Sequence, residues 1–352
     1  MYRLEELCDD GSDDRRDVPK VTKVIVQIPC LNEELTLPQV VADIPRDIPG
    51  VDRVEILVVD DGSSDRTVEV AKALGVDHIL VNRRNLGLAH TFRRGLDASL
   101  HLGADIIVNT DGDNQYAGAD IARLVQPILD GTADIVVGDR QTDQNQEFSP
   151  LKRLLQRAGS GAVRNLSGLD IPDAVSGFRA ISRDAALRIN IVSSFSYTTE
   201  MLIQAGKKRL AVASVPVATN PKTRESRLFR GIPSFVSRQL STMVRMYSMY
   251  QPLRVFFLIG TILSVIGVIP ILRFLIFYAL GEGDGHIQSL VLGGVFVLMG
   301  FVAYLVGLVA DLINFNRQLV EIALEKVRRL ELAAERSDGD MIDQEVPQDA
   351  TD

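Results

Sequence analysis

Cysteine is scarce in this sequence, since Cys8 and Cys30 are the only two among 352 residues, and tryptophan is absent. There is no CxxC pair and no cluster of cysteine with histidine, which excludes a disulfide framework and a structural zinc site. The first twenty residues contain no apolar run and no small-residue cleavage motif, so we expect no signal peptide. We expect residues 1–20 to form a disordered acidic arm.

Positive charge is also in deficit, with 38 Lys and Arg against 46 Asp and Glu and a formal net charge of -8. A nucleic-acid-binding protein needs a basic face to neutralise phosphates, so we expect no nucleic acid partner. Hydrophobic residues make up 46% of the chain. A single core rarely grows beyond about 250 residues, so we expect one large α/β domain and a smaller second unit.

Residues 21–217 alternate short β-branched runs with helical stretches. This alternation predicts an α/β fold with a mostly parallel sheet covered by helices. The strand-like runs are VTKVIVQIP, VEILVVDD, HILVNR, ADIIVNTD and ADIVVGDR. Several end in Pro, Asp, Asn or Gly, and open α/β sheets bind their ligands at the carboxyl ends of the strands. We therefore expect the chemistry along that edge.

The segment TDGDNQY at 110–116 follows an apolar strand-like run. Its carboxylates, Asp111 and Asp113, stand two residues apart, and the carbonyl of Gln115 adds a third oxygen. Mg²⁺ and Mn²⁺ prefer oxygen ligands and are commonly held by one or two carboxylates together with substrate phosphates. The segment predicts a divalent metal site, although a solvated acidic loop would show the same residues.

The first two strands should place their ends side by side. The first ends in PCLNEE and the second in VVDDGSSD. Asp60 or Asp61 could accept a hydrogen bond from a nucleobase or ribose, or could form the turn instead. Ser63, Ser64 or Asp65 is expected to cap a helix that begins near Thr67.

Taken together, LNEE, VVDDGSSDRT, NRRNLGLAHTFRRG, DGDNQY, VVGDR and SGFR occur in an order and spacing that resembles the family 2 glycosyltransferases. Among these, residues 21–230 are similar to the polyprenyl-phosphate sugar transferases, the group of the dolichol-phosphate mannose synthases. The resemblance implies a GT-A nucleotide-sugar-binding fold, a divalent metal (Mg²⁺ or Mn²⁺) and inversion at the anomeric carbon. It also implies a nucleotide-sugar donor and a polyprenyl phosphate acceptor.

The resemblance also assigns donor-side roles. The nucleotide-sugar would be bound by residues at the ends of the first, second and fourth strand-like runs, namely Pro29, Leu31, Asn32, Glu33, Asp60, Asp61, Asp111 and Gly112. The metal on its diphosphate would be held by Asp111, Asp113 and Gln115. Arg140 matches the arginine near the reacting phosphate, with Asp139 where the family has a small residue. Arg179 of SGFR is either structural or functional.

Further basic residues complete the implied site. TRESRLF at 223–229 resembles the GESKL segment of the family, with Arg224 in place of Gly and Arg227 in place of Lys. The upstream arginine of the family has no aligned partner, and Lys222 and Arg224 are its expected substitutes. A guanidinium binds a diphosphate well. Lys152, Arg153 and Arg157 lie on a predicted basic helix at 151–164 that either receives the acceptor phosphate or is an ordinary solvated face.

Two long apolar runs follow, at 255–280 and 287–313. Each is long enough to cross a hydrocarbon core of about 30 Å, so we expect a transmembrane hairpin over 254–314. The connection GEGDGH lacks Lys and Arg, whereas both flanks are rich in them, which predicts that the catalytic domain and both termini are cytoplasmic. Arg273 inside the first run would snorkel to the far interface or pair with a lipid headgroup.

Residues 231–253 carry apolar side chains at helical spacing among arginines and predict an interfacial amphipathic helix. Residues 315–352 predict a charged cytoplasmic helix with an acidic tail. Glycines of the second apolar run, namely Gly293, Gly294, Gly300 and Gly307, would permit close helix packing. They are consistent with a homo-oligomer through the hairpin or the C-terminal helix, and equally with flexible packing against lipid.

Several alternatives stay open. A transferase onto a neutral lipid would need a general base, for which Glu200 is a candidate, and a catalytically inactive nucleotide-binding scaffold would keep the same fold. A processive synthase is disfavoured because the QxxRW motif and any Trp are absent, and a dehydrogenase because no GxGxxG follows the first strand. GDP-mannose, UDP-glucose and UDP-N-acetylglucosamine all remain possible donors.

Overall fold

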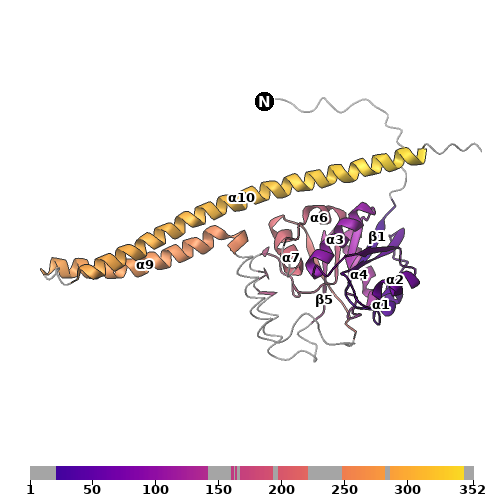
Figure 1. Ribbon diagram of the computed structural model, residues 1–352, viewed down its shortest axis with the longest axis horizontal. Coiled ribbons are helices and arrows are strands. Elements are labelled where there is room, and N and C mark those ends of the chain that lie inside the picture. Colours follow the sequence, from indigo (N-terminus) through magenta and orange to yellow (C-terminus); the bar gives the residue numbers. More distant parts are fainter. Residues whose placement is uncertain are drawn as a thin grey trace, which may run out of the picture.

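A computed structural model describes residues 21–141, 160–161, 163–164, 167–192, 197–220, 248–281 and 286–344. Side chains are described up to residue 334. Figure 1 shows two parts, an α/β domain and a pair of long helices that extends away from it. Most of the predicted interfacial helix lies outside the described residues. So do the acidic arm and the end of the acidic tail.

The α/β domain is built on a seven-stranded sheet of order β3-β2-β1-β4-β6-β5-β7. Its strands are β1 (Lys23–Cys30), β2 (Arg53–Asp60), β3 (His78–Val81), β4 (Ile106–Asn109), β5 (Ile135–Asp139), β6 (Arg179–Ser182) and β7 (Val212–Pro216). All neighbours pair in parallel except β6, which is antiparallel to both β4 and β5. The predicted mostly parallel sheet and its first five strands are confirmed.

Helices cover both faces of the sheet (Figure 1). Alternate residues of one strand point to opposite faces, so Ile25 belongs to one buried cluster and Val24 to the other. The first cluster includes side chains from α3 (Leu88–His101), α6 (Arg183–Arg188) and α7 (Tyr197–Lys207). The second includes side chains from α1 (Leu37–Asp43), α2 (Thr67–Ala73) and α4 (Ile121–Leu129), and a short 3-10 helix, η1 (Gly118–Asp120), precedes α4.

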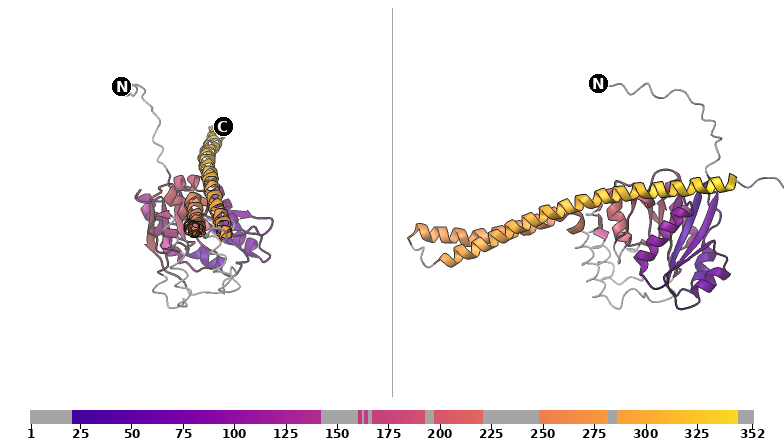
Figure 2. Two further views of the ribbon diagram at one scale, coloured as in Figure 1. Left: turned by 90° about the vertical axis from the view of Figure 1, so that its left-hand side faces the viewer. Right: turned by 45° about the horizontal axis from the view of Figure 1, so that its top comes forward.

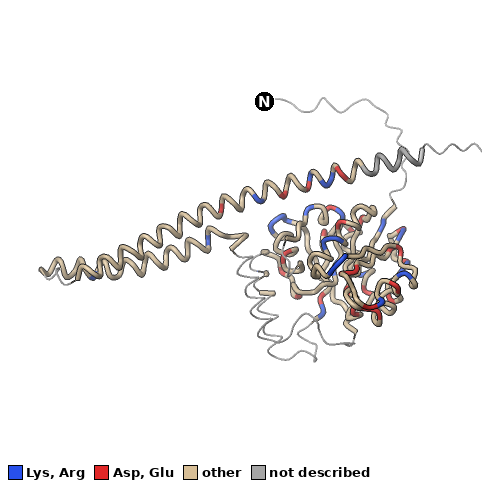
Figure 3. Tube along the Cα trace, viewed as in Figure 1, with Lys and Arg blue, Asp and Glu red and all other residues tan. Residues whose placement is uncertain are grey.

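The two long helices are α9 (Pro252–Ala279) and α10 (Ile287–Gln344), and both are long and apolar enough to cross a membrane. In their most apolar stretches 11% and 17% of the residues are buried. A core helix of a soluble protein would be mostly buried, so this exposure argues against that alternative. Figure 3 shows that the hairpin carries few charges, whereas the α/β domain carries many of both signs.

Glycines bring α9 and α10 into close contact. A Cβ atom on Gly267 would lie 2.7 Å from the carbonyl oxygen of Gly293, and one on Gly300 would lie 2.8 Å from that of Gly260. A Cβ on Gly307 would lie 2.8 Å from the Cβ of Phe256, whereas Gly294 has open space. Of the four glycines that we expected to permit an oligomer, Gly293, Gly300 and Gly307 therefore pack α10 against α9 within one chain.

The helix α10 does not end with its apolar run, because it continues without a break along the α/β domain (Figures 1 and 2). Arg328 forms an ion pair with Asp97 of α3 at 3.4 Å, and Arg329 forms one with Asp184 of α6. Leu332 is buried in the cluster on that face. The apolar run and the charged helix, predicted as separate units, are one element.

Candidate active site

The loop after β4 carries the two aspartates, and it lies against the end of β1. A Cβ atom on Gly112 would lie 3.0 Å from the Sγ of Cys30 and 3.2 Å from the Cγ of Glu33. The hydroxyl of Thr36 donates to the carbonyl of Gly112 at 2.7 Å. Gly112, predicted to contact the donor, has a packing role in the described contacts, because its lack of a side chain lets the two strand ends meet.

Asp111 lies beside Gly177, which precedes the antiparallel strand β6. A Cβ atom on Gly177 would lie 3.1 Å from Oδ2 of Asp111 and 2.9 Å from the hydroxyl of Tyr197. Asn109 at the end of β4 donates to the carbonyl of Gly177 at 2.9 Å and to the Tyr197 hydroxyl at 3.2 Å. Gly177 thus preserves the space next to the Asp111 carboxylate.

Asp113 and Gln115 lie in a tight loop that the end of β7 supports. The backbone N–H of Gln115 donates to Oδ1 of Asp113 at 3.2 Å. The carbonyl of Gln115, a predicted metal ligand, accepts from the backbone N–H of Asn220 at 3.0 Å. A carbonyl oxygen has two lone pairs, so this bond leaves one for a cation.

The residue pair Asn32 and Glu33 connects the ends of β1 and β2. Asn32 adopts a φ of 56°, and its Oδ1 accepts from the backbone N–H of Ser64 at 2.8 Å. The backbone N–H of Glu33 donates to the hydroxyl of Thr67 at 2.8 Å. The helix begins at Thr67 as predicted, but the predicted cap is wrong, because the N-cap residue is Arg66 and no side chain caps it. Asp65 accepts from the backbone N–H of Thr67 at 3.0 Å.

The two aspartates at the end of β2 have different roles. Both oxygens of Asp61 accept hydrogen bonds, among them 2.8 Å from the Asn82 amide and 2.9 Å from the backbone N–H of Gly87. Asp60 uses Oδ2 for the backbone N–H groups of Gly62 and Ser63, while its Oδ1 is buried and has no partner among the described residues. Asp61 therefore fixes the loop after β3, whereas Asp60 forms the turn after β2 with one oxygen and has the other to offer a ligand.

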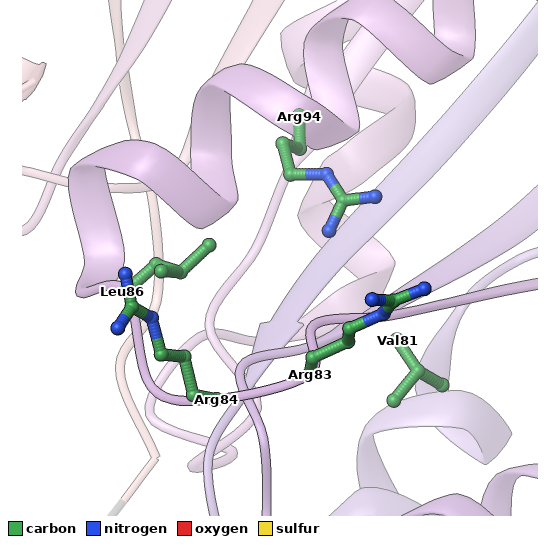
Figure 4. A pocket seen from close by; sticks show the side chains of 5 residues that line it. All are labelled: Val81, Arg83, Arg84, Leu86 and Arg94. Atoms are coloured by element: carbon green, nitrogen blue, oxygen red, sulfur yellow. The ribbon is translucent and has the colours of Figure 1, made fainter.

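A cavity of about 460 Å³ opens next to this edge. Figure 4 shows arginines around it from the loop after β3 and from α3. It is lined by Val81, Arg83, Arg84, Leu86 and Arg94. These arginines were missed as site residues, although they belong to the NRRNLGLAHTFRRG segment that supports the family resemblance. A cluster of guanidinium groups favours phosphate groups.

Arg140 follows β5 and is held by a buried carboxylate. Its Nε donates to Asp173 at 2.7 Å and a terminal nitrogen donates at 3.0 Å. Burial would raise the pKa of Asp173, but these bonds and the positive charge of Arg140 outweigh it and lower that pKa. Asp139, which replaces a small residue of the family, accepts from the backbone N–H of Gln141 at 2.9 Å.

Arg179 is fully buried and has a structural role. Its guanidinium donates to the carbonyls of Thr198 at 2.7 Å, Ser176 at 2.8 Å and Ala174 at 2.9 Å. Burial lowers its pKa to about 10. The structural alternative is therefore favoured, although Arg179 ties β6 to α7 rather than to α6, the helix that follows the strand.

Glu200 is also fully buried. Its carboxylate accepts from the backbone N–H of Val192 at 3.2 Å and from the Gln204 amide at 3.3 Å. This position suits a structural carboxylate of α7 better than a general base.

The basic residues expected to bind the acceptor phosphate or the donor diphosphate lie outside the described residues. These are Lys152, Arg153, Arg157, Lys222, Arg224 and Arg227. Asn220, bonded to the carbonyl of Gln115, is two positions before Lys222 in the chain.

The donor set of the DGD loop fits a hard cation that is shared with a substrate. Within the described ranges, no group of three His, Cys, Asp or Glu side chains is placed to hold a metal by itself. Two carboxylates and a carbonyl suit a cation whose remaining ligands are phosphate oxygens and water.

The sequence profile of glycosyl transferase family 2 matches residues 25–189. The chain is 30% identical to a UDP-N-acetylglucosamine--dolichyl-phosphate N-acetylglucosaminyltransferase of Methanococcus voltae, in a match that covers 54% of this chain and 83% of that relative. This chain belongs to glycosyl transferase family 2. The predicted family is confirmed, and with it the assignment as a glycosyltransferase.

Two further similar proteins add to this comparison. The chain is 28% identical to a polyprenol monophosphomannose synthase of Mycolicibacterium smegmatis, over 59% of this chain and 81% of the relative. Glucosyl-3-phosphoglycerate synthase of Mycobacterium tuberculosis, solved with Mn²⁺, UDP and glucosyl-3-phosphoglycerate, superposes with a TM-score of 0.51 at 22% identity, over 64% of this chain and 79% of that one. At this identity the superposition establishes the fold, and the predicted GT-A class is confirmed.

Proposed function

We propose that this family 2 glycosyltransferase transfers one sugar from a nucleotide-sugar to the phosphate of a polyprenyl phosphate. The observation that carries the proposal is the direct connection of two uncovered apolar helices to a domain whose strand ends gather Asp60, Asp111 and Asp113. An acceptor that cannot leave the bilayer meets a membrane-anchored enzyme at a high effective concentration. The polyprenyl-phosphate transferases among the relatives support the same acceptor class.

The donor would bind along the carboxyl edge of the sheet. The buried, unpartnered Oδ1 of Asp60 suits a nucleoside hydrogen-bond donor. Asp111 and Asp113, with the carbonyl of Gln115, would hold Mg²⁺ or Mn²⁺ on the diphosphate. When bound, that cation would stabilise the charge of the departing nucleoside diphosphate.

The acceptor needs no strong base, because a lipid phosphate is already an anion at neutral pH. Its oxygen would attack the anomeric carbon and the bond to the diphosphate would break, with inversion. Burial would lower the pKa of Arg140, but Tyr116, Asp173 and Asp111 together outweigh it and raise that pKa, so the side chain is a cation. It would orient the attacking phosphate, and Lys152 and Arg153 would assist. Arg224 and Arg227 would stabilise the leaving group.

A neutral lipid acceptor is the weaker candidate. Its hydroxyl would need a general base, and the buried Glu200 already accepts the bonds from α7 and Val192 described above. The proposal does not distinguish GDP-mannose from UDP-hexoses as the donor.

The test uses the full-length protein in detergent with labelled GDP-mannose, UDP-glucose or UDP-N-acetylglucosamine, polyprenyl phosphate and Mn²⁺ or Mg²⁺. We expect one donor to give a labelled polyprenyl phosphate sugar, and chelation by EDTA to abolish it. Asp113→Ala should reduce transfer at least about a hundredfold, the range of lost charge stabilisation. Asp130→Ala, an exposed carboxylate at the end of α4, is the matched control. Unchanged transfer by Asp113→Ala would refute the metal assignment, and a labelled neutral lipid would refute the acceptor.

A further inference from the structure

The part of α10 that leaves the hairpin has two different faces. One contacts the α/β domain, through Arg328 and the buried Leu332. The other exposes aliphatic side chains, since Val320 is 66%, Val327 57% and Leu330 71% exposed. No described residue covers this second face, which we term the outer stripe of α10.

The outer stripe lies beyond the apolar run. The apolar run of α10 ends at Ile313, and a helix rises about 1.5 Å per residue, so Val327 lies roughly 21 Å further along the axis. If the hairpin spans a bilayer, as proposed above, the outer stripe stands in water. A contiguous aliphatic strip in water commonly marks an interface.

The spacing of the stripe identifies what covers it. Ile313, Val320, Val327 and Ala334 recur every seven residues, and a second row of Asn316, Ala323 and Leu330 lies between them. This is the a and d pattern of a left-handed coiled coil, with β-branched residues at three of the four a positions and one polar Asn that can fix the register. A helix face that contacts lipid does not require apolar residues at a seven-residue spacing, whereas a coiled coil does.

We propose that the outer stripe of α10 pairs with the same stripe of a second copy, as a parallel two-stranded coiled coil. Two copies anchored in one bilayer with one topology must send α10 in the same direction, which allows the parallel arrangement and forbids the antiparallel one. In this register Lys326 and Glu331 flank the seam at g and e positions. A parallel pair brings Lys326 of each chain next to Glu331 of the other.

The ion pairs of α10 agree with this arrangement. Within the described part of the chain, neither Lys326 nor Glu331 forms an ion pair, whereas Arg328 and Arg329 on the domain side do. The α/β domains would lie on the outside of the dimer, each held by the domain-facing side of its own α10.

Cysteine cross-linking tests the pairing in membranes that contain the full-length protein with Cys8→Ser. Cys30 is buried and can remain. Val327→Cys at an a position should form an interchain disulfide, because facing Cβ atoms in a parallel pair lie within disulfide range. The control is Gln318→Cys, exposed but off the seam. We expect about tenfold more cross-linked dimer for Val327→Cys, and equal yields would overturn the proposal.

Charge reversal tests the register. Lys326→Glu and Glu331→Lys should each shift the detergent-solubilised protein toward the mass of one chain, measured by light scattering, and the double variant should restore twice that mass. Failure of the double variant to recover would refute the parallel register. A third measurement attaches a fluorophore to Val327→Cys and adds a quencher that resides in the bilayer. Quenching would show that lipid covers the outer stripe and would overturn the dimer. None of these tests depends on glycosyl transfer, so the dimer and the proposed activity can fail separately.

Discussion

Gly177 sets the space beside the Asp111 carboxylate, and we predict that Gly177→Ala reduces transfer more than it reduces stability. The added methyl would contact Oδ2 of Asp111 and the hydroxyl of Tyr197. A shift of about 1 Å in a catalytic group is enough to lower the rate roughly a hundredfold. The measurement compares kcat and thermal unfolding with those of Gly161→Ala, whose added methyl has open space. Equal kcat for the two variants would show that Asp111 tolerates the displacement.

The pair of Arg140 and Asp173 gives a prediction for pH. The pKa of Asp173 is lower in the folded protein than in the unfolded chain. The pair therefore stabilises the fold fully above the unfolded pKa of about 3.9, and this stabilisation is lost as the pH falls from there through the lower folded pKa. Asp173→Asn leaves Arg140 without its partner and should cost about 3 kcal/mol at pH 7. Urea unfolding followed by circular dichroism should show this difference shrinking below pH 4. A difference that is constant with pH would contradict the assignment.

At this scale the sequence predicts residue positions better than residue contacts. The motif order placed Asp111 and Asp113 at a strand end, where the structure has them. It did not separate Asp60 from Asp61, because their roles depend on Asn82 and the backbone of Gly87, more than twenty residues away. The partner of Arg140 was missed for the same reason, since Asp173 is 33 residues further along the chain.

Among the helices, the glycine contacts of the hairpin make a specific prediction. Gly267→Leu would place its side chain against the backbone of Gly293 and Val297 in α10, whereas Gly294→Leu would enter open space. We expect the first variant to lose about 2 kcal/mol of stability through overpacking and the second to lose little. Thermal unfolding of both in the same detergent, followed by circular dichroism, measures this. Equal losses would mean that α9 and α10 do not pack through their glycines.

Elements were predictable where their pattern is long and regular. The first five strands and both apolar helices followed from β-branched runs and from hydropathy. The antiparallel strand β6 was missed because four residues carry too little periodicity, although SGFR marked the place. The continuity of α10 was visible in the sequence, since no Gly or Pro occurs between Gly307 and Gly339. It was overlooked because the apolar run and the charged run look like different units.

For the molecule as a whole, the proposed topology places the hairpin tip and the end of α10 on opposite sides of the membrane. In a Cys8→Ser background, Leu280→Cys at the tip should react with an impermeant maleimide added to intact cells. Lys326→Cys should react only after permeabilisation, because the flanks rich in Lys and Arg are expected on the cytoplasmic side. Both positions are exposed, so burial does not bias the comparison. The opposite labelling pattern would reverse the proposed orientation.

If the hairpin spans a bilayer as proposed, the uninterrupted course of α10 makes it a lever as well as an anchor. With 58 residues it is about 87 Å long, and one end lies beside the hairpin tip while the other runs past α6. A helix hairpin adjusts to bilayer thickness by tilting, and a rigid arm converts tilt into displacement at its far end. A thicker or thinner membrane would therefore raise or lower the catalytic edge relative to the lipid headgroups, so that membrane composition would tune how readily a lipid phosphate reaches it.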